Sequence, residues 1–188
     1  MTDTAQAIEP AAPPPGVYEV DPAHSSVTFV ARHLIGSKVR GQFSRFSGTI
    51  TVIEPPESSF VEAEVEAGSL GTGVDQRDQH VLSGDFLDVE HHPKLVLRST
   101  GLAHLGGSGW RMPTELTIRG VTRPVELDLE YLGSGPGMTA GSVVAAFSAS
   151  AEIDRRDFDV SFSGVLESGG LVVGNKVRIE LEIEAARK

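Results

Sequence analysis

A chain of 188 residues is long enough to bury one hydrophobic core, and because it contains no cysteine it has neither disulfides nor thiolate metal ligands. Its formal net charge of -10, from 26 acidic and 16 basic side chains, argues against the cationic surface that nucleic-acid binding requires. The same acidity disfavours docking on anionic lipid, and no apolar run approaches the roughly 20 residues that span a bilayer. We expect one soluble domain that binds no nucleic acid and has no membrane span.

Residues 1–15 form an Ala- and Pro-rich segment that lacks the basic and apolar regions of a secretory signal peptide. Asp3 and Glu9 stand where an export signal would be positively charged. We interpret residues 1–15 as a disordered lead-in and residues 16–188 as one folded domain. The same segment favours a cytoplasmic location, although a chain that had lost its true N-terminus would look alike.

Alternating apolar and polar residues predict strands with one dry and one solvated face. In chain order, we expect strands at residues 25–32, 39–42, 47–53, 61–67, 94–102, 109–118, 125–131, 143–153 and 177–184. The clearest of them is 61–67, in which glutamates separate small apolar residues. Residues 74–86 lack the alternation and are predicted to form a short helix.

Strands that are solvated on one face belong to antiparallel sheets, because parallel sheets are covered on both faces. Many short strands with a single helix indicate a sandwich or a barrel, and only a closed barrel has no exposed strand edges. We therefore predict a mainly β fold, a single antiparallel barrel of about eight strands with one short helix. Such a barrel either fills with side chains or holds one small ligand, so the fold alone leaves function open.

Four segments carry a more specific pattern. The first segment, residues 21–48, contains Phe29, His33 and Gly41-Gln42-Phe43. The second, residues 69–99, contains Arg77-Asp78-Gln79-His80 and Asp85-Phe86-Leu87-Asp88. The third segment is residues 115–125, and the fourth is residues 153–158 together with the expected strand 177–184. In this order and spacing, from about Gly16 to Ala185, the chain resembles the YceI-like family of polyisoprenoid-binding proteins.

The resemblance implies a lipocalin-like barrel with a helix beside it, whose interior binds a long isoprenoid or another amphiphilic chain. It brings no catalytic residue with it, and it admits exported as well as cytoplasmic members. Two positions depart from the family pattern: Leu87 stands where a second Phe is common, and Val81-Leu82 where Leu and a polar residue are usual. Both changes are expected to reshape a pocket wall without disturbing the barrel.

Polar and aromatic side chains supply the candidate ligand-binding residues. Arg77, Asp78 and His80 could bind a headgroup, since a guanidinium offers a planar fork to phosphate oxygens, but Arg77 or Asp78 could equally tie the helix to the barrel. The aromatic candidates in or beside expected strands and the helix are Phe29, Phe43, Phe46, Phe86, Phe147, Phe158 and Phe162. Several of these must form ordinary core, because aromatic residues dominate any core.

No metal, cofactor or catalytic group is expected from the remaining polar residues. His80, His91 and His92 lie near acidic residues, but their spacing matches no compact zinc site. Asp21, His24 and Ser25 could be drawn as a triad, yet no nucleophile elbow supports it, and we interpret them as structural capping.

Three functions remain to be compared. The main hypothesis is non-catalytic transport or storage of a lipid-like small molecule, a polyisoprenoid, quinone-like or fatty-acid-like chain, inside the barrel. The alternative is a small-molecule enzyme that uses Asp78, Asp85 or Asp154 at the barrel mouth as acid or base. The third is an interaction module, which would need a broad apolar outer patch, and a homodimer formed through a barrel edge stays open.

Overall fold

The alternating residues of β5 (Phe60–Glu66) show how this sequence builds a barrel wall. Glu62, Glu64 and Glu66 are exposed, whereas the residues between them, Val61, Ala63 and Val65, are half-buried. Successive side chains of a strand point to opposite faces, so one face is solvated and the other turns inward. The computed structural model describes residues 12–33, 36–139, 141–164 and 172–188, and most strands within them follow the same scheme.

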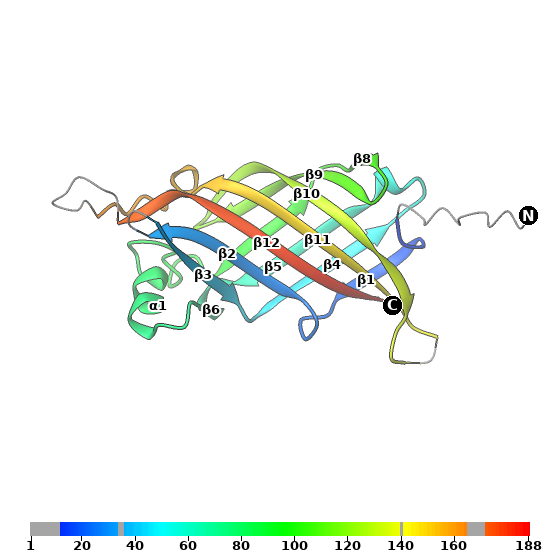
Figure 1. Cartoon of the computed structure of the whole chain (residues 1–188), viewed down its shortest axis with the longest axis horizontal. Coiled ribbons are helices and arrows are strands. Elements are labelled where there is room, and N and C mark those ends of the chain that lie inside the picture. Colours follow the sequence, from blue (N-terminus) through cyan, green and yellow to red (C-terminus); the bar gives the residue numbers. More distant parts are fainter. Residues whose placement is uncertain (1–11, 34–35, 140, 165–171) are drawn as a thin grey trace, which may run out of the picture.

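Twelve strands, one α-helix and three 3-10 turns make up the described fold (Figure 1). The strands are β1 (Gly16–Val20), β2 (Ser26–His33), β3 (Ser37–Phe43), β4 (Phe46–Val52), β5 (Phe60–Glu66), β6 (Leu70–Gly71), β7 (Lys94–Ser99), β8 (Ala103–Gly106), β9 (Gly109–Ile118), β10 (Val121–Pro136), β11 (Val143–Asp154) and β12 (Val173–Arg187). The turns are η1 (Pro56–Ser58), η2 (Ala67–Ser69) and η3 (Arg155–Phe158), and the helix is α1 (Asp75–Leu82).

All nine expected strands are present, with small differences at their ends. The sequence did not indicate β1, β6 or β8, because each is short and β8 is exposed along its whole length. The helix ends earlier than expected. The hydroxyl and the backbone N–H of Ser83 both donate to the carbonyl oxygen of His80, and the extended backbone of Ser83 stops the helix there.

The strands close into an antiparallel ring of 8 strand positions, because four of the positions are each shared by two strands in series, one of them by β7 and β8, which both pair with β9. β1 and β2 both pair with β12, and the loop of residues 21–25 separates them. β3 continues into β4, and β5 continues through η2 into β6, which pairs with β3. With β7, β9, β10, β11 and β12, this confirms the predicted mainly β, lipocalin-like barrel.

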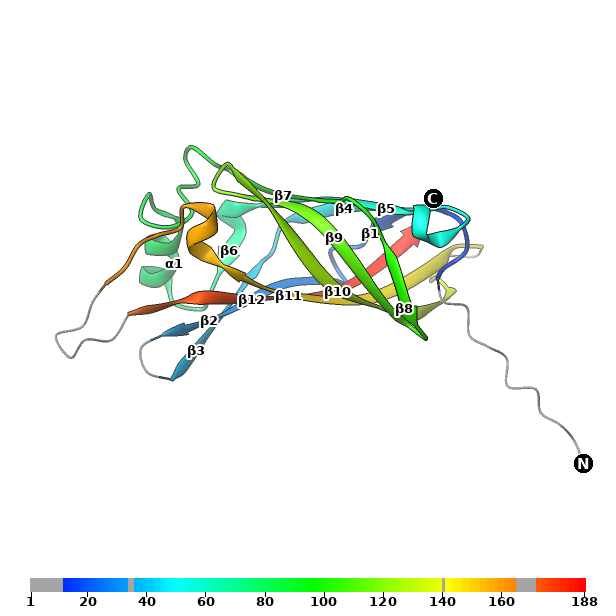
Figure 2. The ribbon, with the colours of Figure 1, turned by 90° about the horizontal axis from the view of Figure 1, so that it is seen from above.

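The two ends of the barrel differ. At the β1 end, Tyr18, Trp110, Tyr131 and Phe147 form a packed aromatic cluster. At the other end, α1 and the η3 turn lie beside the barrel opening, as Figures 1 and 2 show. One end is therefore closed by side chains, and the other is bordered by separate elements.

Residues 12–15 belong to the segment that the sequence assigned to a disordered lead-in, but they contact the barrel. Ala12 packs against the aromatic cluster, Pro13 is buried, and the hydroxyl of Tyr18 donates to the carbonyl oxygen of Pro14 at 2.8 Å. Residues 1–11 lie outside the described residues. Contacts with the barrel thus already include residues that precede β1.

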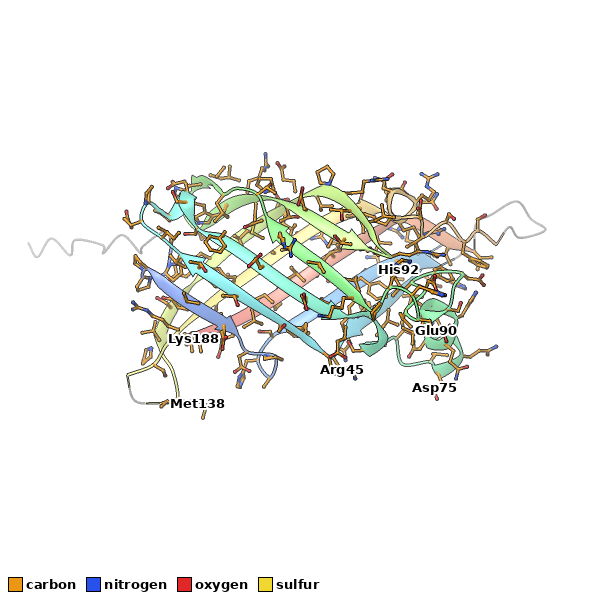
Figure 3. All side chains as sticks on the ribbon, turned by 180° about the vertical axis from the view of Figure 1, so that it is seen from behind. Arg45, Asp75, Glu90, His92, Met138 and Lys188 are labelled. Carbon is orange, nitrogen blue, oxygen red and sulfur yellow. The ribbon has the colours of Figure 1, made fainter. Side chains whose placement is uncertain are left out.

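Charged side chains cover the outer face and pair across neighbouring strands. The ammonium of Lys94 lies 2.6 Å from Glu64, and that of Lys176 lies 2.6 Å from Glu152. Charged residues also mark the barrel ends: Asp75 and Glu90 lie at the α1 end and Lys188 at the opposite end (Figure 3). Such exposed pairs add little stability, so the fold depends on the apolar interior.

Two leucines of β10 test this division between interior and surface. Leu127 is 1% exposed and Leu132 is 53% exposed. We expect Leu127→Ala to lower the free energy of unfolding by about 3 kcal/mol, because it removes buried methyl groups and leaves a void. The matched change Leu132→Ala should cost less than about 0.5 kcal/mol. Urea unfolding of both variants measures the difference, and equal losses would contradict the assigned faces of β10.

Candidate functional site

The barrel interior holds a cavity of about 700 Å³ in the half of the barrel beside α1. Most of its wall consists of Val, Leu, Ile and Phe side chains from the strands, and α1 and η3 add residues at its end. A cavity of this size lies within the range of small-molecule sites, roughly 300–1,000 Å³. Its geometry suits an apolar ligand.

Eight of the ten candidate ligand-binding residues line this cavity. They are Phe29, Phe43, Phe46, Phe86, Phe158, Phe162, Arg77 and His80. They come from β2, β3, β4, α1, η3 and the loops after α1 and η3, so elements distant in the sequence meet here. The structure thus brings these eight predicted residues together around one cavity.

Phe147 and Asp78 are not among the lining residues of the main cavity. Phe147 lies 5.6 Å, between ring centroids, from Tyr131 and lines a smaller cavity of about 90 Å³ at the β1 end. The alternation of residues correctly predicted that Phe147 points inward from β11, but it did not predict where along the barrel axis Phe147 lies. Asp78 bonds Thr72 and does not line the cavity.

Phe29 occupies space that a glycine provides. A Cβ atom at Gly41 would lie 2.3 Å from Cζ of the Phe29 ring, closer than any real contact. The ring of Phe29 thus lies over the backbone of Gly41 on the neighbouring strand, and its centroid is 6.0 Å from that of Phe43. Glycine within a strand often marks such a close approach.

Aromatic side chains also surround His80 at the cavity end. Its ring makes edge contacts with Phe86 and Phe162, with centroids 5.1 Å and 4.9 Å apart. Its Nε2 lies 2.9 Å from the carboxylate of Asp85. Of the residues that depart from the family pattern, Val81 and Leu87 line the cavity as well, whereas Leu82 is not among its lining residues.

Arg77 and Asp78 both bond Thr72, which follows β6. The backbone N–H of Thr72 donates to Asp78 Oδ1 at 2.9 Å, and the Thr72 hydroxyl donates to the same oxygen. Arg77 donates from Nε to the Thr72 hydroxyl oxygen at 2.7 Å and from Nη2 to the Thr72 carbonyl at 2.9 Å. Asp78 therefore ties α1 to the barrel, whereas Arg77 both ties the helix and reaches the cavity.

Arg155 is a cavity residue that the sequence did not single out. The residue is 5% exposed, and its guanidinium donates to the carbonyl oxygens of Val160 and Gly174 and to the side-chain oxygen of Asn175. Burial lowers the pKa of Arg155. Its place in the motif Asp154-Arg155-Arg156 was visible, but nothing in that motif distinguishes the buried arginine from the exposed one.

The imagined triad of Asp21, His24 and Ser25 is not assembled. The Ser25 hydroxyl donates to the carbonyl oxygen of Glu184 and accepts from the Glu184 N–H, so it fastens the loop of residues 21–25 to β12. His24 Nδ1 lies 2.8 Å from Asp21 Oδ2. The arrangement is a structural cap, as the sequence indicated.

Among the described residues, one group of three potential metal ligands lies close together, namely Asp21, His24 and Glu184. Asp21 and His24 already bond each other, which accounts for their proximity. His80, His91 and His92 do not converge into such a group within the part of the chain that the structure describes. His91 instead bonds Asp88 at 2.9 Å.

Comparison with known proteins gives the family. The model of the YceI-like domain matches residues 18–185. This chain belongs to the YceI-like family. It is 30% identical over 171 residues to a UPF0312 protein of Staphylococcus aureus, covering 89% of this chain and 95% of that protein. A UPF0312 protein of Vibrio parahaemolyticus is 30% identical over 173 residues, covering 92% and 87%.

Solved structures of YceI-like proteins share the barrel. BcnA of Burkholderia cenocepacia superposes with a TM-score of 0.73 at 20% identity, over 88% of this chain and 98% of that one. The YceI protein of Campylobacter jejuni gives 0.72 at 24% identity, over 84% and 90%. A polyisoprenoid-binding domain from Saccharophagus degradans gives 0.67 at 16% identity, over 91% and 98%. These likenesses establish the fold of this YceI-like chain.

The cap formed by Asp21 and His24 makes a prediction about pH. The hydrogen bond with Asp21 raises the pKa of His24 above 6.5, so its stabilising effect is complete below 6.5 and is lost as pH rises through the folded-state pKa. We expect Asp21→Asn to return the pKa of His24 towards 6.5, measured by NMR titration of the ring protons. His91, whose pKa is raised by Asp88, should be unaffected and is the internal control.

Proposed function

We propose that this YceI-like protein transports or stores one amphiphilic molecule whose long apolar chain, an isoprenoid, quinone-like or fatty chain, lies inside the barrel. The observation that carries the proposal is the apolar cavity of about 700 Å³ within a closed wall. The polyisoprenoid-binding domain of Saccharophagus degradans, which has the same fold, supports a ligand of this class. In this proposal, the protein binds the molecule without changing it chemically.

Apolar contact alone supplies enough affinity for such a ligand. Burying one methylene contributes about 0.8 kcal/mol, so three isoprene units of about five carbons each contribute on the order of 12 kcal/mol. Micromolar binding requires only about 8 kcal/mol, which leaves a few kcal/mol for ordering the chain and for lost rigid-body freedom. An apolar cavity therefore suffices to hold an isoprenoid or fatty chain.

The enzyme alternative receives less support from the positions of its carboxylates. Asp78, Asp85 and Asp154 are not among the lining residues of the cavity. Asp78 accepts from Thr72, and Asp85 pairs with His80. Hydrogen bonds from Arg156 lower the pKa of Asp154 to about 2, which keeps it ionised and makes it a weak proton acceptor near neutral pH.

The interaction-module alternative would need a broad apolar outer patch. The exposed large apolar residues include Val17 and Phe60, which flank Thr51 across neighbouring strands, while Leu105, Leu132 and Met138 lie elsewhere on the chain.

None of the described helices is both long enough and apolar enough to cross a bilayer. Dimerisation through a barrel edge and a cytoplasmic location stay predictions, which light scattering on a sizing column and cell fractionation test.

The experiment that tests the proposal is mass spectrometry of lipids extracted from the purified protein, with a variant whose cavity is blocked. We expect the native protein to yield a lipid with a long apolar chain. Ala63 lines the cavity and Ala103 on β8 is exposed, so Ala63→Trp should abolish lipid recovery and Ala103→Trp should not. Circular dichroism checks that each variant is folded.

Two results would contradict the proposal. One is a native protein that yields no lipid and takes up none of a set of isoprenoid and fatty probes. The other is a folded Ala63→Trp variant that binds those probes as well as the native protein. If Ala63→Trp does not fold, the extraction and probe uptake of the native protein decide the question alone.

Met112 makes a further prediction about chain length. It lines both the main cavity and the smaller cavity at the β1 end, together with Ile50 and Val61. We expect affinity for a series of fatty acids to stop rising at the length whose tail meets Met112. In Met112→Ala the cavities join, so affinity should keep rising by about fourfold for each added methylene.

Calorimetric titration of the same series with each protein measures this change. Met138 is fully exposed, so Met138→Ala is the matched control and should keep the native length limit. An unchanged limit in a folded Met112→Ala variant would show that Met112 does not separate the two cavities for a bound chain.

A further inference from the structure

The charges on the cavity wall have a single sign. Among the described residues that line the cavity, none is Asp or Glu, whereas the wall includes Arg32, Arg77, Arg155 and the histidines His33 and His80. The whole chain has the opposite balance, with 26 acidic and 16 basic side chains. From the composition alone, acidic residues would be expected on the cavity wall as well, yet they are absent from its described lining.

Several cations on the outer face are paired with carboxylates, unlike Arg77 and Arg155. Arg98 pairs with Glu62, and Lys94 pairs with Glu64. Arg77 and Arg155, in contrast, form no ion pair with a carboxylate of the described residues. Both residues line the cavity, and neither guanidinium is in direct contact with a carboxylate, although the charge of the neighbouring Asp154 acts on Arg155.

The guanidinium of Arg77 is held along one edge only. Its Nε and one N–H of Nη2 donate to Thr72. A guanidinium carries five N–H donors, so Nη1 and the second N–H of Nη2 have no acceptor among the described residues. Asp78, the adjacent carboxylate, accepts from Thr72 and does not line the cavity. Arg77 is thus fixed in place with a free edge.

Arg155 adds a second positive charge in a less polar setting. The acceptors that it binds are uncharged: the carbonyl oxygens of Val160, Val173 and Gly174 and the amide oxygen of Asn175. Its side chain is buried, where a charge acts over a longer distance than in water. Arg155 therefore makes the adjoining part of the cavity attractive to an anion.

Both arginines belong to the same end of the barrel. Arg77 lies on α1 and Arg155 begins η3, and two perpendicular views place these elements at the same end of the barrel (Figures 1 and 2). Farther from α1, the cavity is lined by apolar residues such as Leu97, Met112 and Leu127. The cavity is therefore polar and cationic at one end and apolar beyond it.

We propose that the ligand is an amphiphile with an anionic headgroup, a carboxylate or a phosphate ester, which the free edge of Arg77 binds at the α1 end while its chain extends into the barrel. This inference rests on the proposed function and narrows it to acidic lipids. Two parallel N–H groups of a guanidinium match the two oxygens of such a headgroup. Arg155 attracts the anion without giving up the bonds that fasten η3 to β12.

The test compares ligands that differ only in the headgroup. Hexadecanoate and hexadecanol share one chain, and farnesyl phosphate and farnesol share another. Calorimetric titration at about pH 8, where the carboxylic acid is ionised, gives the affinities. We expect each anion to bind at least about tenfold more tightly than its alcohol, since a hydrogen bond to a charged group is stronger than one to a neutral group. The two pairs distinguish a carboxylate from a phosphate ligand.

Variants of Arg77 assign this preference to one residue. Arg77→Gln should reduce the preference for the anion to about twofold or less and leave the affinity for the alcohol unchanged. Arg77→Lys keeps the charge and should retain part of the preference. Arg98→Gln, which removes an outer arginine that is paired with Glu62, is the control and should leave it intact.

Several outcomes would overturn the inference. If the native protein binds alcohol and anion equally, or if Arg77→Gln weakens both equally, the headgroup assignment fails while the proposed function stands. If inorganic phosphate displaces farnesyl phosphate and the farnesyl chain adds nothing to the affinity, the cationic end binds anions in general and the inference of an acidic lipid is wrong. If neither member of either pair binds, the proposed function and this inference both fail.

Discussion

The hydrogen-bonded edge of β12 is the constraint on which the rest of this structure depends. β1 pairs with it at residues 185–187 and β2 at residues 173–182, so a single strand closes the ring along both halves of the barrel. Backbone groups in the wall find their partners in neighbouring strands and need nothing from the interior. Closure therefore allows a cavity of about 700 Å³ beneath an intact wall.

Closure of the ring does not by itself stabilise the fold, and the two ends of the barrel are stabilised in different ways. The β1 end is packed with Tyr18, Trp110, Tyr131 and Phe147, whose burial supplies much of the apolar stabilisation. The α1 end gains less stabilisation from packing, because the cavity leaves space among its apolar side chains. Polar contacts also hold its elements, through Thr72 for α1 and Arg155 for η3, beside the packed side chains of Phe86, Phe158 and Val160. The end that would admit a ligand is thus fastened by bonds that do not fill it.

Charge follows the same division. On the outside, acidic side chains are in excess, and many basic side chains pair with them across strands, as Lys94 does with Glu64. The cavity wall keeps only cations at one end and apolar side chains beyond them. In the binding role that we propose, the apolar part of the cavity removes a lipid chain from water, and the guanidinium of Arg77 binds its headgroup.

The sequence determined the strands and their dry faces, because a period of two is a local property of consecutive residues. It also determined the family, through motifs that stay in order along the chain. It could not tell that Phe158 lines the large cavity while Phe147 belongs to the packed end, or that Arg155 is buried beside an exposed Arg156. Those differences depend on depth along the barrel axis, which is set by the register between strands far apart in sequence, such as β12 with β1 and β2. Only the closed tertiary structure fixes that register, and with it the place and charge of the cavity.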